Sequence, residues 1–421
     1  MDRRQEMAAA VADAGPTRVA ARADATAGPG LEGRDIVYRG FRGPALAAGD
    51  LAGAALAGDT VVIAAPAGVR RHTDPHTGVT VAYEYATWTS PVVSPGFAAT
   101  EVIPSWTADT PTGCWVQIEL AGVTIAGTTT GWYDLGHWAG DDSGIPRTSV
   151  PRQRDDDGHV AVDTFVAASG RALTRWRLRV TLLRPVGTTA TPALRSVGAV
   201  ASRLPEPGEV TPSRPQSAQG VILDVPRYSQ RVHDGHYPQW DGGGRSWCSP
   251  TSTAMVLSFW GVGPTPADYA WVDPADSAPW VDHAARHCYD YAYGGCGNWA
   301  FNTAYAGRFG LDAFLTRLRS LNEAELFIDA GIPLILSAAY QKDQVPGLDY
   351  STNGHLVVLV GFTERGEPVL NDPAADSDDL VRKVVGRAEF EAAWLNSSRG
   401  LVYVIRPPSV SLPAAPAQAN W

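Results

Sequence analysis

The sequence predicts a multidomain protein in which an all-β domain precedes an α+β domain. The chain has 421 residues, and at about 150 residues per domain it is too long for one compact core. Short runs of alternating polar and apolar residues fill its first half, whereas helix-like and strand-like segments alternate in its second half. Four prolines between residues 203 and 217 separate the two patterns, so we place an extended linker at 203–220.

The first domain, residues 35–202, has the pattern of a β-sandwich. Over residues 175–180, three arginines alternate with a tryptophan, a leucine and a valine, which is typical of a strand with one buried face. Roughly eight to ten such strands, separated by glycine, proline and aspartate, predict two sheets of jelly-roll type.

Residues 221–407 predict the α+β domain. We expect helices after Cys248 as far as Gly261 and over 280–291, 299–309, 322–331 and 387–395, and strands over 333–339, 356–362, 368–370 and 401–405. Asn298 is the expected N-cap of the helix at 299–309. Residues 1–34 are expected to be a disordered leader, and the proline- and alanine-rich residues 408–421 a flexible tail.

Charge and hydropathy exclude two classes of protein. Lysine and arginine number 34 against 44 acidic residues, a formal charge of -10 with no basic block, so we expect no nucleic-acid partner. No run of 18 apolar residues occurs, so we expect no transmembrane helix. The apolar run from Met7 to Ala12 stops at Asp13 and is too short for a signal peptide.

Cys248 is the strongest candidate for a nucleophile. It lies between Trp247 and Ser249, where the predicted helix begins, and a helix N-terminus favours the reactive thiolate. A small buried residue at the start of the helix is the alternative. Cys288 and Cys296 are only eight residues apart, which allows either a local disulfide or two buried thiols.

Three polar residues could complete a site around this cysteine. His355 directly precedes an apolar strand, and Asp372 follows the next strand, where a carboxylate can orient an imidazole. A regular hairpin would pair Asp372 with about Val358, an offset from His355 of about 10 Å, so contact requires a bulge, sheet twist or an offset turn. Gln230, upstream of the cysteine, could donate a hydrogen bond to an oxyanion. Taken alone, none of the three residues requires a functional explanation, and a lone histidine at such a place is more often structural.

Taken together, these segments resemble the peptidase C39-like family of papain-fold cysteine peptidases. The resemblance covers about residues 222–407 and rests on Val225-Pro226 through Gln230, Trp247-Cys248 with Pro250 and Thr251, Gly297-Asn298-Trp299 to Asn302, Gly354-His355, and Asn371-Asp372-Pro373. It implies that Cys248 is the nucleophile, His355 the general base, Asp372 its orienting acid and Gln230 the oxyanion donor. Ser249 departs from the glycine that often follows the nucleophile, and its side chain could crowd the cleft.

The resemblance predicts a thiol-dependent peptidase, with Trp247, Asn298, Trp299 and Gly354 near a peptide or protein substrate. For Asn298 and Trp299, helix capping and a buried ring are an equal alternative. Two other functions stay open: a catalytically silent binding protein for peptide or cell-envelope polymer, and an acyltransferase or amidase using the same triad. The best-known family members trim leader peptides and are fused to membrane transporters, so their substrate cannot be transferred to this chain.

No cofactor or metal is expected. His283 and His287, or His233 and His236, could converge, but the HEXXH pattern of zinc peptidases is absent because Ala284 follows His283.

The partner of the first domain and the location of the protein are predicted only coarsely. Five tryptophans of that domain could form a platform for a carbohydrate or cell-wall ligand or could pack in its core; they are Trp88, Trp106, Trp132, Trp138 and Trp176. The layout of a sandwich followed by a hydrolase is common among secreted proteins, although this chain shows no signal peptide.

Overall fold

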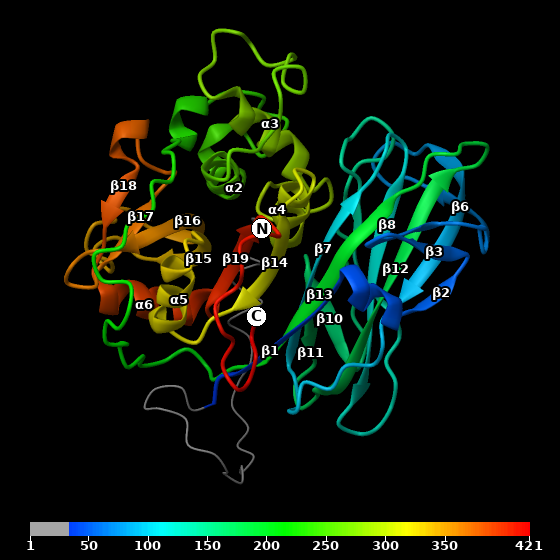
Figure 1. Ribbon diagram of the computed structural model, residues 1–421, viewed down its shortest axis with the longest axis horizontal. Helices are drawn as coiled ribbons and strands as arrows, with labels where there is room; N and C mark the ends of the chain where they lie inside the picture. The colour runs from blue at the N-terminus through cyan, green and yellow to red at the C-terminus, as the bar shows by residue number, and fades with distance from the viewer. Residues whose placement is uncertain (1–32) are drawn as a thin grey trace.

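The computed structural model describes residues 33–421, so nearly all of the predicted leader, residues 1–34, lies outside the described residues. An N-terminal β-sandwich and a C-terminal α+β domain stand side by side (Figure 1). This confirms the predicted fold class. Among the described residues, no helix is long and apolar enough to cross a membrane.

The N-terminal domain contains thirteen strands among the described residues, more than the eight to ten predicted. They are β1 (Asp35–Arg42), β2 (Asp50–Ala52), β3 (Ala54–Ala57), β4 (Thr60–Ile63), β5 (Gly68–Thr73), β6 (Thr80–Thr89), β7 (Glu101–Asp109), β8 (Trp115–Thr124), β9 (Tyr133–Trp138), β10 (Gly158–Ala161), β11 (Thr164–Ala167), β12 (Leu173–Pro185) and β13 (Ala193–Arg203), with a 3-10 helix η1 (Gly43–Ala48) after β1. One antiparallel sheet has the order β10-β11-β7-β13-β4-β3, with β1 also on β13, and the other has the order β2-β6-β12-β8-β9, with β5 on β6. Five of the thirteen strands are only three or four residues long.

The sandwich core is built from tryptophans, which decides between two interpretations of these residues. Trp88, Trp106, Trp138 and Trp176 are fully buried. Trp132 is half-buried and lies beneath the guanidinium groups of Arg177 and Arg179, at 5.0 and 4.2 Å from the ring centroid. The five rings therefore do not form an open platform for a sugar, and core packing explains four of them.

The C-terminal domain is one antiparallel sheet with helices on both faces. Its elements are η2 (Gln230–His233), η3 (Gly244–Ser246), α2 (Cys248–Phe259), α3 (Pro279–Cys288), α4 (Trp299–Gly307), β14 (Asp312–Arg317), α5 (Leu321–Asp329), β15 (Leu334–Tyr340), β16 (Thr352–Phe362), β17 (Pro368–Asn371), η4 (Asp378–Leu380), β18 (Arg382–Val384), α6 (Arg387–Ser397) and β19 (Leu401–Arg406). The strand order is β14-β19-β15-β16-β17-β18.

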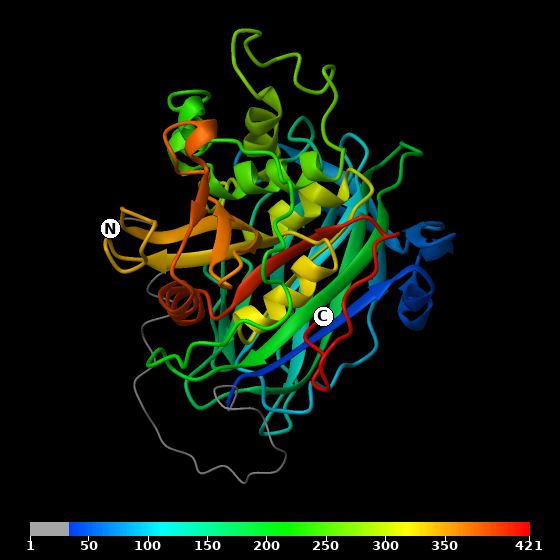
Figure 2. The same ribbon diagram turned by 60° about the vertical axis from the view of Figure 1, so that its left-hand side comes forward.

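Alternation along β16 separates the two faces of this sheet. Leu356, Val358 and Val360 belong to the apolar cluster that includes α2, whereas Val357 and Leu359 belong to the cluster that includes α5 and α6. Figure 2 shows the same sheet with α2 above it and α6 below it. Helix α2 is therefore buried along most of its length, from Ser249 to Leu257, and Cys248 is its first residue.

Helix α4 of the C-terminal domain packs directly against the N-terminal domain. Its Phe301 packs against Trp106 of β7 and Trp138 of β9, with ring centroids 6.1 and 5.4 Å apart. Gly307 allows the close approach of the backbones, because a Cβ there would lie 2.5 Å from the side chain of Thr107. Buried residues of both domains form one continuous apolar cluster, so we expect the two domains to unfold together.

The two proline-rich segments pack against the C-terminal domain. Residues 204–229 contain no helix or strand, and the backbone N–H groups of Gln216 and Ser217 donate to the buried carboxylate of Glu325 at 2.8 and 2.7 Å. The expectation of a flexible tail at 408–421 is wrong. Tyr38 N–H donates to Ala419 at 3.0 Å, and the Trp421 ring lies 5.0 Å from that of Phe327, so the tail is anchored at its last residues.

Candidate active site

Cys248 is the first residue of α2, as its sequence context predicts. Pro250 suits the first turn because the N–H that it lacks would have no partner within the helix. Trp247, directly before it, is fully buried, and its indole N–H donates to the Trp240 carbonyl at 2.7 Å. The thiol is half-buried at the end of the helix, so the buried ring beneath it fixes the backbone from which the thiol projects.

His355 and Asp372 are in direct contact, which resolves the offset that a regular hairpin predicts. Nε2 of His355 lies 2.7 Å from Oδ1 of Asp372. A bulge between Leu359 and Gly361 shifts the register of β16 on β17, so that Asn371 pairs with Val358. Asp372 then lies opposite residue 357, which is two residues from His355 and on the same face of the strand. Without the bulge the two side chains would point to opposite faces.

The other side of the His355 ring faces the thiol. Because Nε2 is occupied by Asp372, Nδ1 is the nitrogen available to Cys248, with which His355 forms a side-chain hydrogen bond. Burial disfavours the charged imidazolium, but hydrogen bonds to Asp372 and Cys248, together with their negative charges, raise the pKa of His355 from 6.5 to about 10. The ring is therefore held as imidazolium at neutral pH.

Asp372 has two further partners, one of which the sequence did not indicate. Its Oδ1 accepts from the Tyr350 hydroxyl at 3.0 Å and from the Ala374 N–H at 2.9 Å. Burial of this carboxyl favours its neutral form, yet the hydrogen bond and charge of His355 and these two donors lower its pKa below 3.8. Tyr350 lies in the loop before β16, where nothing in its local sequence distinguishes it from other loop tyrosines.

Replacing Tyr350 with phenylalanine tests this positioning role. A hydrogen bond to a charged group is worth about 1.5–3 kcal/mol, so we expect Tyr350→Phe to lower activity about tenfold. The lost donor also raises the pKa of Asp372, so the acid limb of the pH profile should move to higher pH. The alkylation rate of Cys248 measured against pH reports this shift without a substrate. An unchanged profile, equal to that of a Tyr228→Phe control, would contradict the role.

Gln230 is held beside the segment that leads to the cysteine. Its backbone N–H donates to the Pro373 carbonyl at 2.8 Å, and its side-chain amide donates to the Arg245 carbonyl at 2.7 Å. Gln230 is buried, but a primary amide has two N–H groups, of which the Arg245 carbonyl uses one. The contact with Pro373, next to Asp372, ties Gln230 to both halves of the site.

Ser249 does not crowd the cleft. Its side chain is fully buried, and its hydroxyl lies 2.9 Å from the hydroxyl of Tyr403 on β19. The serine therefore points into the domain core and fixes α2 to the sheet at the residue after the nucleophile.

The structure separates the four expected substrate contacts into two pairs. Trp247 is buried as described above, and Asn298 is also buried: its side chain accepts from Phe301 N–H at 3.1 Å and donates to Asp290 at 2.9 Å. These contacts bear out the N-cap role of Asn298. These internal contacts give both side chains a structural role, and substrate contact by Trp247 and Asn298 stays a prediction. Trp299 and Gly354, in contrast, both line a pocket at the domain boundary.

This pocket of about 90 Å³ is shared by the two domains. Its lining comprises Glu101, Ala161, Val162, Asp163, Thr164 and Val166 from the sandwich, and Gly297, Trp299, Arg317, Ser337, Ala338, Ala339, Gly354, Ser397 and Ser398 from the C-terminal domain. Ala338 pairs with His355 in the sheet, and Gly354 precedes His355 in the chain. The pocket therefore adjoins the histidine side of the candidate active site.

The hairpin β10–β11 brings the sandwich into this pocket. Asp163 in its turn accepts hydrogen bonds from the Trp299 N–H at 2.8 Å and the Thr164 hydroxyl at 3.0 Å. Burial nevertheless raises the pKa of the Asp163 carboxyl to about 6. Val162 beside it has φ of 59°, a conformation that is strained for a β-branched residue. The interdomain contact holds this turn in place.

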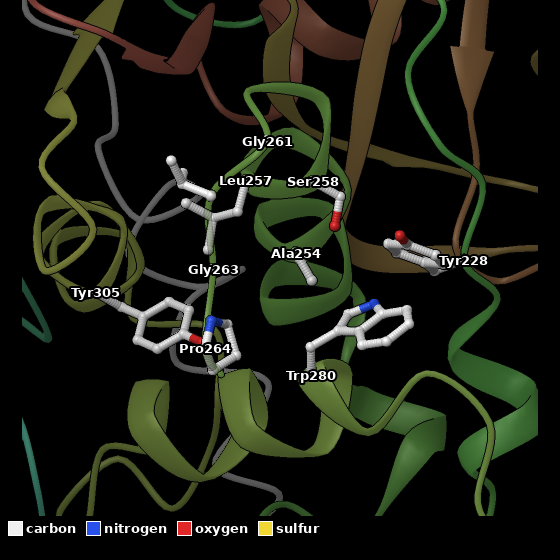
Figure 3. Close-up of a pocket in the computed structure, with 10 residues that line it drawn as sticks. Tyr228, Ala254, Leu257, Ser258, Gly261, Gly263, Pro264, Trp280 and Tyr305 are labelled. Carbon is white, nitrogen blue, oxygen red and sulfur yellow. The ribbon is translucent and has the colours of Figure 1, made fainter. Parts of the chain in front are cut away.

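A larger cavity than this interdomain pocket lies elsewhere. It has a volume of about 360 Å³ and is lined by the second half of α2, the loop after it, Tyr228, Trp280 and Tyr305 (Figure 3). None of the residues with catalytic chemistry lines it. Its size therefore does not make it the active site.

The remaining cysteines are unreactive in this fold. All four cysteines are free, so Cys288 and Cys296 are two buried thiols rather than a disulfide. Burial raises the pKa of Cys114 to about 11 and those of Cys288 and Cys296 further. Cys248 is the only cysteine of the chain that is not buried.

The histidines expected to converge fall into two separate groups. The rings of His283 and His287 lie 4.0 Å apart, and their Nδ1 atoms lie 2.8 Å from the Tyr305 hydroxyl and the Gly140 carbonyl. Burial lowers the pKa of both rings. They are therefore neutral structural side chains of the domain interface. His233 and His236 form the other group, together with Asp282.

A helix beginning at a cysteine, beside a sheet that carries a paired histidine and aspartate, defines a papain-like cysteine-peptidase fold. Residues 222–402 match the profile described as the peptidase C39-like family, and residues 39–202 match that of the peptidase C39 N-terminal domain. The two parts of the chain thus belong to these families, which confirms the resemblance inferred from the motifs.

More distant likenesses were found among solved structures. A C39-like protein of Bacillus anthracis is 22% identical, with a TM-score of 0.30 over 45% of this chain and 98% of its own. A prointerpain A fragment of Prevotella intermedia is 14% identical, with a TM-score of 0.27 over 47% of this chain and 75% of its own. The carbohydrate-binding module TmCBM61, in complex with β-1,4-galactotriose, is 7% identical, with a TM-score of 0.17 over 40% of this chain and 88% of its own. None of the curated proteins matches the chain.

Proposed function

We propose that this protein is a thiol-dependent peptidase whose nucleophile is Cys248. The observation that carries the proposal is the chain of contacts from the Cys248 thiol through His355 to Asp372, with the last two 2.7 Å apart. This is the order of nucleophile, base and orienting acid that acyl transfer requires.

Hydrolysis would proceed in two steps. The Cys248 thiolate attacks the peptide carbonyl carbon, and the developing oxyanion accepts hydrogen bonds from the Cys248 N–H and the second side-chain N–H of Gln230. One such donor is worth about 3 kcal/mol of barrier. The imidazolium of His355 then gives its proton to the leaving amine, and the C–N bond breaks to leave a thioester. Neutral His355 takes a proton from water, which attacks the thioester and releases the acid and Cys248.

We further propose that the N-terminal domain forms one wall of the substrate site. The pocket beside His355 is lined from one side by the β10–β11 hairpin and from the other by Trp299 and Gly354. Its volume of about 90 Å³ suits one small side chain of a peptide. The sandwich would then contribute to specificity instead of acting only as an anchor.

Filling this pocket from the sandwich side tests its role. Ala161 is half-buried and lines the pocket, and phenylalanine there would occupy most of the volume. We expect Ala161→Phe to lower kcat/KM about tenfold or more through KM, since occluding a side-chain pocket costs about 1–3 kcal/mol. Alkylation of Cys248 should be unaffected. Ala168→Phe, in the same hairpin region but outside the pocket lining, is the matched control, and an equal loss in both variants would remove the pocket from the proposal.

The experiment that tests the proposed function is a substrate search with wild-type protein. The full chain is incubated with a diverse peptide library, and new termini are identified by mass spectrometry. Cleavage that is absent from Cys248→Ala supports the peptidase. Products that carry an added amine in place of water indicate an acyltransferase. Peptide binding equal in both proteins, without turnover, indicates a silent binding protein and overturns the proposal.

A further inference from the structure

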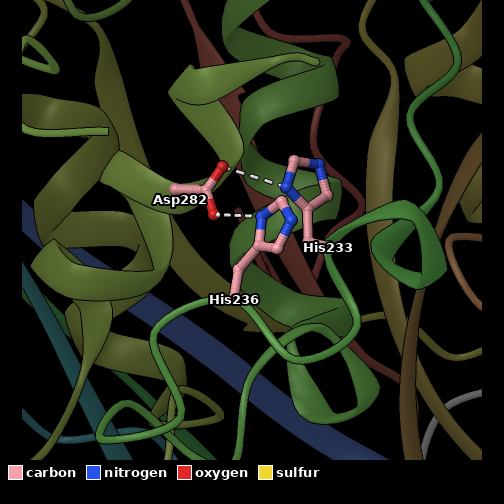
Figure 4. A group of neighbouring side chains, drawn as sticks. All are labelled: His233, His236 and Asp282. Carbon is pink, nitrogen blue, oxygen red and sulfur yellow. Dashed lines mark hydrogen bonds and ion pairs between the residues drawn. The ribbon is translucent and has the colours of Figure 1, made fainter. Parts of the chain in front are cut away.

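His233, His236 and Asp282 form a compact cluster that links the segment before Cys248 to helix α3 (Figure 4). Nδ1 of His233 lies 2.9 Å from Oδ2 of Asp282, and Nδ1 of His236 lies 3.1 Å from Oδ1 of the same carboxylate. One potential ligand atom from each residue lies within 4.8 Å of the others. His233 and Asp282 are fully buried, and His236 is partly exposed.

His236 Nδ1 and Asp282 Oδ1 form a hydrogen bond of 3.1 Å, but the fully buried His233 side of the cluster is not satisfied by hydrogen bonds. Both ring nitrogens of His233 and Oδ2 of Asp282 are buried without a hydrogen-bond partner. His233 Nδ1 and Asp282 Oδ2 are therefore close together, but the angles of the contact are not those of a hydrogen bond. Burying an imidazole and a carboxylate in this state costs free energy unless another group pairs with both. A cation between them would accept lone pairs from both at once.

The donor set and its spacing fit a transition-metal ion. At zinc–ligand distances of about 2.0–2.2 Å, tetrahedral ligands lie about 3.3 Å apart, close to the 2.9 and 3.1 Å seen for the two histidine–aspartate pairs. Imidazole nitrogen with a carboxylate oxygen is a donor set that zinc accepts, whereas calcium and magnesium take mainly oxygen. Three protein ligands leave a fourth tetrahedral position for water, on the side of the partly exposed His236.

His236 also has the outer partner that metal-bound histidines usually have. Its second nitrogen, Nε2, lies 3.5 Å from Oδ1 of Asp276. A carboxylate in this position fixes the orientation of the ring and raises the basicity of the ligand nitrogen. The turn from His233 to His236 is closed by a backbone hydrogen bond of 3.0 Å between the two residues, which places both rings on one side.

We propose that this cluster is a zinc site with three protein ligands and a water, and that the ion fixes the loop carrying Gln230 to helix α3. Gln230 and His233 lie in the same 3-10 helix, η2, and Asp282 lies in the first turn of α3. Gly244 packs directly on this loop, since a Cβ there would lie 2.2 Å from the Gln230 carbonyl. The ion thus holds both the oxyanion side chain and the segment entering Cys248. Zinc binding itself does not depend on the proposed peptidase activity.

Zinc binding to the full chain tests the proposal directly. Protein stripped with a chelator is titrated with Zn²⁺ against a chromophoric competitor, and cobalt is used to read the ligand geometry from its visible spectrum. We expect one equivalent of Zn²⁺, a tetrahedral cobalt spectrum, and a rise in Tm on adding zinc. Failure of folded wild-type protein to bind Zn²⁺ at micromolar concentration would overturn the site.

Variants locate the binding. His236→Gln should abolish the equivalent of zinc, and because His236 is partly exposed this variant should remain folded. Asp276→Asn should weaken binding about 10- to 100-fold, as loss of an outer partner does. His159→Gln, a half-buried histidine of the sandwich, is the control and should bind as wild type does. Unchanged affinity in His236→Gln would place the metal elsewhere and overturn the proposal, whatever the peptidase activity of the protein.

Discussion

Cys248→Ala is expected to reduce kcat on any cleaved peptide by about 10⁶-fold, as removal of the nucleophile does in a serine peptidase. Alanine keeps the helix start and removes only a half-buried sulfur, so the free energy of unfolding should change little. Initial rates of peptide cleavage, together with thermal unfolding of the same preparations, measure both effects. A loss of kcat without a change in stability would then show that the variant lacks the nucleophile and not the fold.

The control for this variant is another cysteine of the same chain. Cys114 is buried in the sandwich, and its thiol lies 3.8 Å from the Ala190 carbonyl, far in the chain from the proposed site. Cys114→Ala should retain full activity even if it lowers Tm. Activity of Cys248→Ala above about 1% of wild type would rule out this cysteine as the nucleophile, since a triad without its nucleophile retains far less.

Much of this site could be predicted from local sequence, because short-range chemistry determines it. The start of α2 at Cys248 follows from a proline in the first turn and a glycine after the end. The N-cap at Asn298 follows from an amide before an apolar segment, and its hydrogen bond to Phe301 bears this out. The polar and apolar alternation of β12 follows from the burial of one face, and the continuous apolar run of β16 follows from the burial of both faces. In each case the signal lies within one turn or one strand.

The parts that could not be predicted depend on contacts between distant segments. The bulge in β16 that brings His355 onto the face of Asp372 is one extra residue in an apolar run, and no local pattern marks it. Tyr350 reaches Asp372 only after the loop before β16 folds back over the strand. Asp282 joins His233 across 49 positions of the chain, so histidine spacing alone could not reveal the cluster. The tail is anchored by Trp421, although its composition predicts flexibility.

His355→Ala is expected to slow alkylation of Cys248 by roughly 10²- to 10³-fold at about pH 6. The reason is electrostatic: a free thiol with a pKa of about 8.5 is only about 0.3% thiolate at that pH, whereas an adjacent imidazolium favours the thiolate. Since the pKa of His355 is raised to about 10, the ring stays charged from pH 6 through pH 8. Labelling of each cysteine, read by mass spectrometry against pH, measures the effect.

The other cysteines are internal controls in the same experiment. Cys114, Cys288 and Cys296 are buried, and their raised pKa values keep them protonated at pH 6, so native protein should be labelled at Cys248 alone. Equal labelling rates in wild type and His355→Ala would mean that the imidazolium does not activate the thiol. Such a result would contradict both the role of His355 as the base and the ion pair between Cys248 and His355 in the proposed mechanism.

The interaction between Cys248 and His355 must also appear in the pKa of the histidine. The negative charge and the hydrogen bond of Cys248 raise the pKa of His355, so removing them in Cys248→Ala must lower it, and Asp372→Asn must lower it further. NMR titration of the His355 ring measures both shifts. A fall in the two variants, with no change in Cys114→Ala, would show that one buried network sets the charge of the imidazole. Because burial alone would lower this pKa below 6.5, a value that remained near 10 in both variants would require a different source of the charge.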